Sequence, residues 1–318
     1  MNRRVGIAVA LALLYVLWGS TYLAIRVSLE AFPPLLMAGV RFLIAGGALY
    51  TWGRRSGGAA ATARHWLQAT GLGALFFVGG NGGVVWAETR VPSGVAALLI
   101  AMVPMWIAAI EAVVFGLRPT AGRAVGLVVG LVGVALIVGP GDDGGRVDPF
   151  GALALVGSAL AWATGTLLSR KVDLPGDAIA ASGMQMLGGG VLLTILGLLA
   201  GEHHATVVLT ARSVSAFLWL MIAGSLVGFT LYQWLLRVST PAIASTYAYV
   251  NPAVAVLLGA VFADEVVSPR LGVAGLLITV AVALISIFRA PLSPSAATAS
   301  AGSEARTETD GAVRPAPP

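Results

Sequence analysis

Ten apolar runs fill most of the chain between residues 5 and 288. A helix that rises 1.5 Å per residue needs roughly 20 apolar residues to cross the hydrocarbon core of a bilayer, and each run is close to that length. The sequence therefore predicts an all-α integral membrane protein of ten transmembrane helices. The expected spans are residues 5–25, 33–52, 67–87, 93–116, 124–140, 150–168, 179–200, 214–236, 241–263 and 271–288.

The composition excludes an ordinary soluble domain. Charged residues make up 10% of the 318 residues and hydrophobic residues 58%, whereas soluble domains carry about 25% charged residues. The net charge of +5 comes from arginines that lie singly or in pairs between the apolar runs, so a nucleic-acid partner is not expected. The chain has no cysteine, which excludes disulfides, a thiolate nucleophile and a cysteine-ligated metal.

Arginine and lysine residues in the loops predict the orientation. If the N-terminus is inside, eleven of these residues fall in inside loops and five in outside loops, which selects a cytoplasmic location for both termini. The first run is too long and lacks the cleavage site of a signal peptide. Residues 289–318 are rich in Pro, Ala, Ser and Thr and predict a disordered cytoplasmic tail.

The fourth and ninth runs carry nearly the same pattern. Val91-Pro92-Ser93-Gly94 precedes Pro104, and Thr240-Pro241-Ala242-Ile243 precedes Pro252. We expect each span to be broken near its middle by proline. Each is the fourth of five, and five is odd, so the second set should enter the membrane inverted. The predicted organisation is a first repeat at 5–140, an outer linker at 141–149 and a second repeat at 150–288, as in many secondary transporters.

Several motifs add a resemblance to a known family. They are Trp-Gly-Ser-Thr-Tyr at 18–22, Pro33-Pro34 followed by Arg41-Phe42, Gly80-Asn81-Gly82, Val91-Pro92-Ser93-Gly94, and the stretch from Ser245 to Pro252. In this order the chain resembles the EamA family of the drug/metabolite transporter (DMT) superfamily, and in particular its YedA-type branch of exporters, over roughly residues 5–288. One departure is that the first repeat lacks the acidic corner that the second keeps at Asp264-Glu265.

The resemblance implies a specific function and location. It predicts two EamA repeats of five spans, in a multi-pass protein of the bacterial inner membrane. It also predicts efflux of small metabolites, amino acids or drug-like compounds by alternating access. The scarcity of charge in the spans favours neutral, zwitterionic or amphipathic substrates.

Two prolines and one asparagine are the first candidates for a substrate cavity. Pro104 and Pro252 each leave a backbone carbonyl free near the bilayer midplane, and such a carbonyl needs a partner in lipid. The alternative is a kink that only shapes packing. The Asn251 amide is expected to bind a substrate polar group or to satisfy a neighbouring backbone group, and Tyr247 shares its face.

Tyr15, Trp18, Asn81 and Trp162 complete the predicted cavity lining. Inversion of the repeats should place Trp18 and Trp162 at opposite depths, as gates on either side of one cavity. The alternative is an aromatic belt at the membrane interface. Asn81 stands among glycines that allow close helix contact.

The few charged residues in the spans or at their ends have separate expected roles. Arg41 and Glu88 are predicted to form a structural ion pair near the outer side. Glu111 is a candidate carrier of a coupling proton, because an ionisable group inside a membrane is often functional. Pairing of Glu111 with Arg118 or Arg170 is the alternative.

Other function classes find less support. No His or Asp lies in a span and no P-loop is present, so the chain is not expected to be an enzyme or to use ATP, a metal or a cofactor. A passive channel or facilitator and a non-transporting scaffold remain alternatives. The expected partners are a small-molecule substrate and the lipid bilayer. Gly126-x-x-x-Gly130 packs within the subunit or supports a homodimer.

Overall fold

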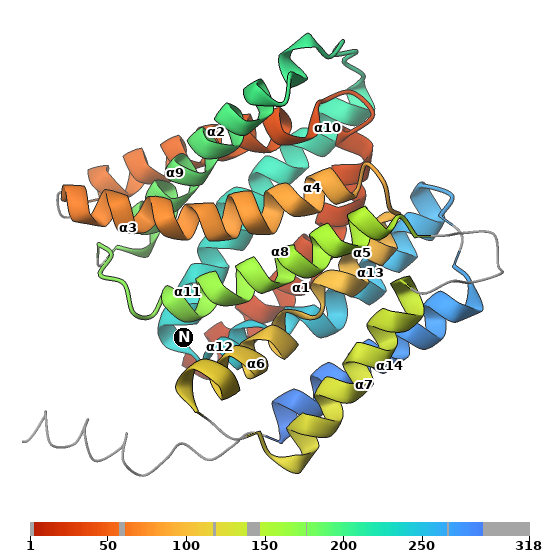
Figure 1. The fold of residues 1–318 in the computed structure, drawn as a ribbon. Coiled ribbons are helices and arrows are strands. Elements are labelled where there is room, and N and C mark those ends of the chain that lie inside the picture. Colours follow the sequence, from red (N-terminus) through yellow and green to blue (C-terminus); the bar gives the residue numbers. More distant parts are fainter. Residues whose placement is uncertain are drawn as a thin grey trace, which may run out of the picture.

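The computed structural model describes residues 3–56, 61–116, 119–138, 147–175, 177–265 and 267–288. Within these ranges every regular element is helical, and the helices run back and forth through one bundle (Figure 1). The predicted tail at 289–318 lies outside the described residues, as do residues 141–146 of the predicted linker.

The helices of the first half of the chain are α1 (Arg3–Ser28), α2 (Pro34–Arg55), α3 (Ala63–Gly73), η1 (Ala74–Gly82), α4 (Gly83–Ala87), α5 (Ser93–Ile100), α6 (Val103–Phe115) and α7 (Ala121–Val138). Those of the second half are α8 (Pro149–Leu168), α9 (Ala178–Leu199), η2 (Glu202–His204), α10 (Ala211–Trp219), η3 (Leu220–Phe229), α11 (Thr230–Val238), α12 (Pro241–Ala244), α13 (Tyr247–Phe262) and α14 (Pro269–Ile287).

Seven helical stretches are long and apolar enough to cross a membrane. They are Arg3–Ser28, Pro34–Arg55, Ala63–Ala87, Ser93–Val114, Pro149–Leu168, Ala178–Leu199 and Ala211–Val238. Shorter apolar helices at Ala121–Ile137, Val250–Phe262 and Pro269–Ile285 fall in the other three predicted runs. The described residues therefore confirm an all-helical chain with multiple candidate spans, while the count of ten stays a prediction.

Side-chain hydrogen bonds connect segments that are distant in the sequence at both ends of the bundle. At the N-terminal end, where α1 begins, Arg3 donates to the carbonyl of Val238 at 2.6 Å. At the far end, where α1 finishes, the Glu265 carboxylate accepts the backbone N–H groups of Ser93 and Gly94 at 2.7 and 3.1 Å. The Glu202 carboxylate likewise accepts the backbone N–H groups of Leu35 and Leu36 in the first turn of α2. Both acids cap a helix N-terminus, where negative charge is favourable.

Helices from the two halves of the chain pack in pairs. α2 runs along α9, α7 along α14, α1 along α13 and α5 along α8. The α7–α14 pair forms one edge of the bundle, on the side away from α2 and α9 (Figure 1). A Cβ added to Gly126 would lie 2.9 Å from the carbonyl oxygen of Ala281 in α14. The predicted Gly126 motif is thus used for contact within the chain.

The fourth and ninth predicted spans are both interrupted. α5 finishes at Ile100 and α6 begins at Val103, with Pro104 in its first turn, where a missing N–H costs little. Pro252, in contrast, lies inside the continuous helix α13, so the prediction that it breaks its span is wrong.

The break in the ninth span comes earlier, between α12 and α13. There the side chains of Ser245 and Thr246 donate to the carbonyls of Pro241 and Ile243 at 2.7 and 2.8 Å. Hydroxyl side chains that bond the preceding turn compete with the helical hydrogen-bond pattern. They mark the interruption better than the proline does.

The third and eighth predicted spans contain π-helical segments. η1 lies between α3 and α4, and η3 lies between α10 and α11. The apolar runs at both places predict transmembrane helices without such a change of helix geometry. Segments of this kind are rare, and they occur frequently at functional sites.

Candidate binding cavity

A cavity lies where the two interrupted spans and the two π-helical segments, η1 and η3, meet. Its volume is about 80 Å³, room for several water molecules because one needs about 10–15 Å³. Ile100 contributes from the end of α5 and Tyr247 from the start of α13. The π-helical segments contribute Gly80, Asn81, Gly224, Ser225 and Phe229. Straight helices supply most of the remaining lining, including Trp18, Tyr22, Arg41, Phe42, Ser158 and Trp162.

Aromatic rings form much of the cavity wall. The ring centroids of Trp18 and Trp162 lie 5.5 Å apart in an edge-to-face arrangement, and Tyr247 lies 4.9 Å from Trp18. The two tryptophans therefore belong to one cluster, and the prediction that they gate opposite depths is wrong. Each stands near the middle of its span, where antiparallel helices reach the same depth, and a large indole bridges the remaining gap.

Each tryptophan packs on a π-helical segment that presents glycine. The Trp18 Nε1–H donates to the carbonyl of Gly224 in η3 at 3.1 Å. A Cβ added to Gly80 in η1 would lie 2.8 Å from Cε3 of Trp162. The Trp162 Nε1–H donates to the Tyr232 hydroxyl at 3.3 Å. The glycines thus let the indoles approach the backbone closely.

Asn251 and Tyr15 connect α1 to α13 beside the cavity. In the amide orientation that satisfies both its neighbours, Asn251 donates to the carbonyls of Tyr247 and Tyr15, each at 3.1 Å. The Tyr15 hydroxyl shares a 2.8 Å hydrogen bond with Thr246. Asn251 belongs to the cavity lining, whereas Tyr15 and the two prolines at 104 and 252 do not.

Arg41 and Glu88 do not form the expected ion pair. Arg41 donates from Nη2 to Oδ1 of Asn81 at 2.6 Å, and its Nε has no hydrogen-bond partner. Arg41 lies two turns into α2, whereas Glu88 directly follows α4, so about two turns of depth separate them. Asn81, two turns before Glu88, stands at the depth of Arg41 instead.

Glu88 is itself completely buried, one residue past its candidate span. Neither carboxylate oxygen has a hydrogen-bond partner, although Arg26 donates to its backbone carbonyl at 3.0 Å. Burial, reinforced by the Glu265 carboxylate and partly offset by Arg26, holds the pKa of Glu88 well above its usual range. This arrangement favours a neutral carboxyl group at this position.

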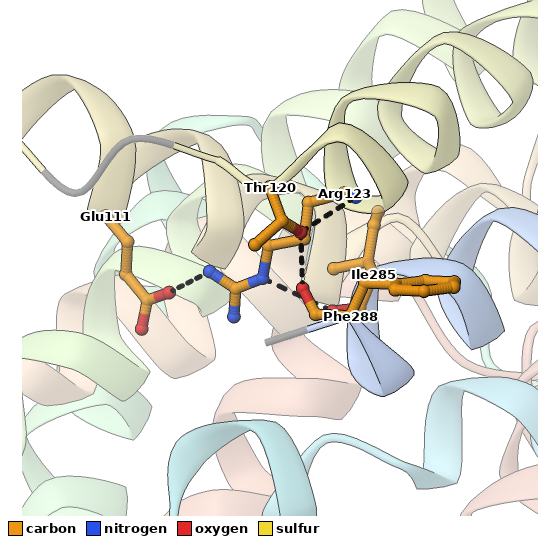
Figure 2. A network of polar contacts seen from close by, with 5 residues as sticks. All are labelled: Glu111, Thr120, Arg123, Ile285 and Phe288. Atoms are coloured by element: carbon orange, nitrogen blue, oxygen red, sulfur yellow. Dashed lines mark hydrogen bonds and ion pairs between the residues drawn. The ribbon is translucent and has the colours of Figure 1, made fainter. Parts of the chain in front are cut away.

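Glu111 lies away from the cavity, in a polar network at the N-terminal end of the bundle (Figure 2). Its carboxylate pairs with Arg123 of α7 at 3.3 Å rather than with Arg170, and Arg118 lies outside the described residues. Arg123 also donates to the carbonyl of Ile285 at 3.4 Å, and Thr120 donates to that of Phe288 at 2.7 Å. The network ties α6 and α7 to the end of α14. Glu111 therefore has a structural partner and is not among the residues that line the cavity.

Sequence reasoning missed several lining residues. Arg41 was assigned a structural role, although a charge two turns inside a span is itself a signal of function. Ser158, Ser225 and Phe229 carry no signal in the sequence beyond their place in apolar runs. Among the described residues, no group of three or more His, Cys, Asp or Glu side chains is arranged to hold a metal ion.

Comparisons with known proteins agree with this architecture. Residues 6–139 and 149–287 each match the EamA-like transporter family. The chain is 38% identical over 283 residues to "Uncharacterized inner membrane transporter YedA" of Escherichia coli K12, covering 87% of this chain and 90% of the relative. It is 30% identical over 287 residues to the "Probable terminal-alkyne amino-acid exporter" of Streptantibioticus cattleyicolor, covering 85% and 91%.

A third relative and one solved structure extend the comparison. The "Probable amino-acid metabolite efflux pump" of Salmonella typhimurium is 25% identical over 249 residues, covering 74% of this chain and 79% of the relative. A protein crystal structure aligns with a TM-score of 0.64 at 21% identity, covering 91% of this chain and all of the other. At that identity the likeness concerns the fold alone.

Proposed function

Since this chain belongs to the EamA-like transporter family, we propose that it is a secondary-active transporter that moves a small molecule through this cavity by alternating access. One observation carries the proposal: both interrupted helices and both π-helical segments line a single cavity. Discontinuous helices form the substrate sites of many secondary transporters. The cavity volume of about 80 Å³ is smaller than most metabolites, so both binding and passage require the helices to move, which favours a carrier over a passive channel.

The proposed mechanism uses two inverted repeats of five spans, at residues 5–140 and 150–288, with both termini in the cytoplasm. The helix pairs support this symmetry. α2–α9 and α7–α14 join the second and fifth spans to their equivalents, and α1–α13 corresponds to α8–α5. Likewise Trp18 packs on η3 as Trp162 packs on η1. Rocking of one repeat against the other would then open the cavity to each side in turn.

The proposed direction is export of small metabolites, amino acids or drug-like compounds from a bacterial cytoplasm across the inner membrane. The names of the relatives support this direction, since two of them are named a "Probable terminal-alkyne amino-acid exporter" and a "Probable amino-acid metabolite efflux pump". The cavity chemistry supports small amphipathic compounds, because aromatic rings dominate its wall. A transporter requires a cavity of this kind, whereas a non-transporting scaffold does not.

Counterflow in proteoliposomes tests the proposal without knowledge of the coupling ion. Vesicles are preloaded with pooled metabolites and amino acids, and uptake of each labelled compound is followed over a range of concentrations. A carrier gives saturable uptake that exceeds equilibrium for a time, whereas a channel gives neither. A scaffold gives no uptake.

The matched variants are Trp18→Phe in the cavity and Trp52→Phe outside it, where Trp52 is 61% exposed. Trp18→Phe removes the hydrogen bond to Gly224 and part of the wall, so we expect the transport rate to fall about tenfold, the change that 1.4 kcal/mol produces. Trp52→Phe should leave the rate unchanged. Equal rates in both variants would contradict the placement of the site.

A further inference from the structure

Arg41 is the one charged side chain among the cavity-lining residues of the described structure. Its side chain is 2% exposed, and it projects from the second turn of α2. An ionisable group at such a depth in a span is costly and is usually paired or functional.

The contacts of Arg41 neutralise none of its charge. Asn81 accepts one hydrogen bond at 2.6 Å, and the ring of Phe42 lies 4.3 Å from the guanidinium carbon. The guanidinium has five N–H donors, and Nε has no partner. No carboxylate in the part of the chain that the structure describes pairs with it. The site therefore has a buried cation with donor capacity left over.

A buried charge normally needs an opposite charge beside it. Acidic side chains elsewhere in the bundle are used differently: Glu111 pairs with Arg123, and Glu202 and Glu265 cap helices. Asn81 is a neutral acceptor at the place where an acid would complete an internal ion pair. The absence of a countercharge among these contacts is consistent with a site that binds an anion reversibly.

We propose that Arg41, oriented by Asn81, binds the carboxylate of a monocarboxylate substrate whose apolar body lies against Trp18, Trp162 and Phe229. The planar guanidinium fork matches a carboxylate better than any other side chain does. A single cation suits one negative charge, and the aromatic wall suits an apolar body. This inference rests on the proposed transport function, since it assigns the substrate class of the same cavity.

Binding of matched acids and amides to the purified full-length protein tests the inference. The probes are 3-methylbutanoate with 3-methylbutanamide, and 3-phenylpropanoate with 3-phenylpropanamide, titrated by calorimetry. Each pair has the same shape and differs in charge. We expect each acid to bind at least about tenfold more tightly than its amide, the advantage of a charge-assisted hydrogen bond in a dry site. Equal affinities, or no binding of either acid, would overturn the inference.

Two cavity variants and one control locate the effect. Arg41→Gln should remove the preference for the acid. Asn81→Asp places a carboxylate beside Arg41, so it should abolish acid binding while the fold is retained or stabilised. Arg90→Gln is the control, because Arg90 also stacks on an aromatic neighbour, Trp86 at 4.5 Å, but outside the cavity. A purely structural Arg41 predicts that Asn81→Asp still binds the acids normally, and that result would refute the assignment.

Counterflow with the same four probes separates this inference from the proposed function. Acid-selective binding without counterflow would leave the carboxylate site standing and reject the carrier. Saturable counterflow with no preference for acids over amides would leave the carrier standing and reject the carboxylate site.

Discussion

At the scale of single residues, Glu111 is an acidic residue in an apolar run that stabilises helix packing through its ion pair with Arg123. Arg123 is 8% exposed, and its guanidinium lies between Glu111 of α6 and the carbonyl of Ile285 in α14. Loss of the carboxylate would leave a nearly buried cation with only a neutral acceptor. The pair therefore stabilises the junction of three helices.

The corresponding prediction is that Glu111→Gln lowers stability without changing how transport depends on pH. We expect a loss of about 1 kcal/mol, because glutamine keeps a neutral acceptor for Arg123 but loses the charge that strengthens the hydrogen bond, seen as a lower Tm in detergent. Glu30→Gln is the matched control, since Glu30 pairs with Arg212 at 3.7 Å with both side chains about half exposed, and such pairs contribute little. A shifted pH profile of counterflow with an unchanged Tm would restore the coupling role.

At the scale of helices, the π-helical segments hold the tryptophans against the cavity. Gly80 of η1 lies so close to Trp162 that an added Cβ would be 2.8 Å from its ring. Gly157, on α8, has open space around an added Cβ. The two glycines therefore form a matched pair for the same substitution.

We predict that Gly80→Ala displaces the Trp162 indole and reduces counterflow about tenfold or more, with a lower Tm. Gly157→Ala should leave transport unchanged and raise stability by up to about 1 kcal/mol, the difference in helix propensity. Both are measured as initial rates in proteoliposomes and as melting in detergent. Equal transport in the two variants would mean that the contact between η1 and Trp162 does not shape the site.

The helical elements also show where sequence reasoning stops. Length and hydropathy predict the helices well, because the bilayer sets both. The interruption of the ninth span was expected at Pro252 but occurs at Ser245 and Thr246, because a proline removes one donor while two hydroxyls offer the backbone other partners. The π-helical segments have no signature that hydropathy detects, since they change helix geometry without changing composition.

At the scale of the whole molecule, the sequence anticipates which residues approach the cavity better than how they interact. Each predicted residue that lines it carries a polar group, which is costly when it faces lipid near mid-span: Trp18, Asn81, Trp162, Tyr247 and Asn251. Partners are harder to predict. Arg41 meets Asn81 rather than Glu88, since pairing depends on depth and rotation in two helices at once, and an error of one residue turns a helix by about 100°.

The last prediction concerns orientation, which the repeat symmetry and the loop arginines jointly imply. The chain has no native cysteine, so a single introduced cysteine carries the only thiol. Ser56 and Lys171 are exposed at the N-terminal end of the bundle, and Thr89 and Thr206 are exposed at the far end. In whole bacterial cells, a membrane-impermeant maleimide should label Thr89→Cys and Thr206→Cys, and it should label Ser56→Cys and Lys171→Cys only after lysis.

Labelling at four sites distinguishes an error in the orientation from an error in the number of spans, which labelling at one site cannot do. If all four sites exchange sides together, the excess of inside arginines has misassigned the orientation, while the even number of spans between Ser56 and Lys171 is kept. If Ser56→Cys and Lys171→Cys label from opposite sides, an odd number of spans separates them and one of the two repeats does not contain five. The inverted relation between the repeats would then fail, because it requires an odd number of spans in each repeat.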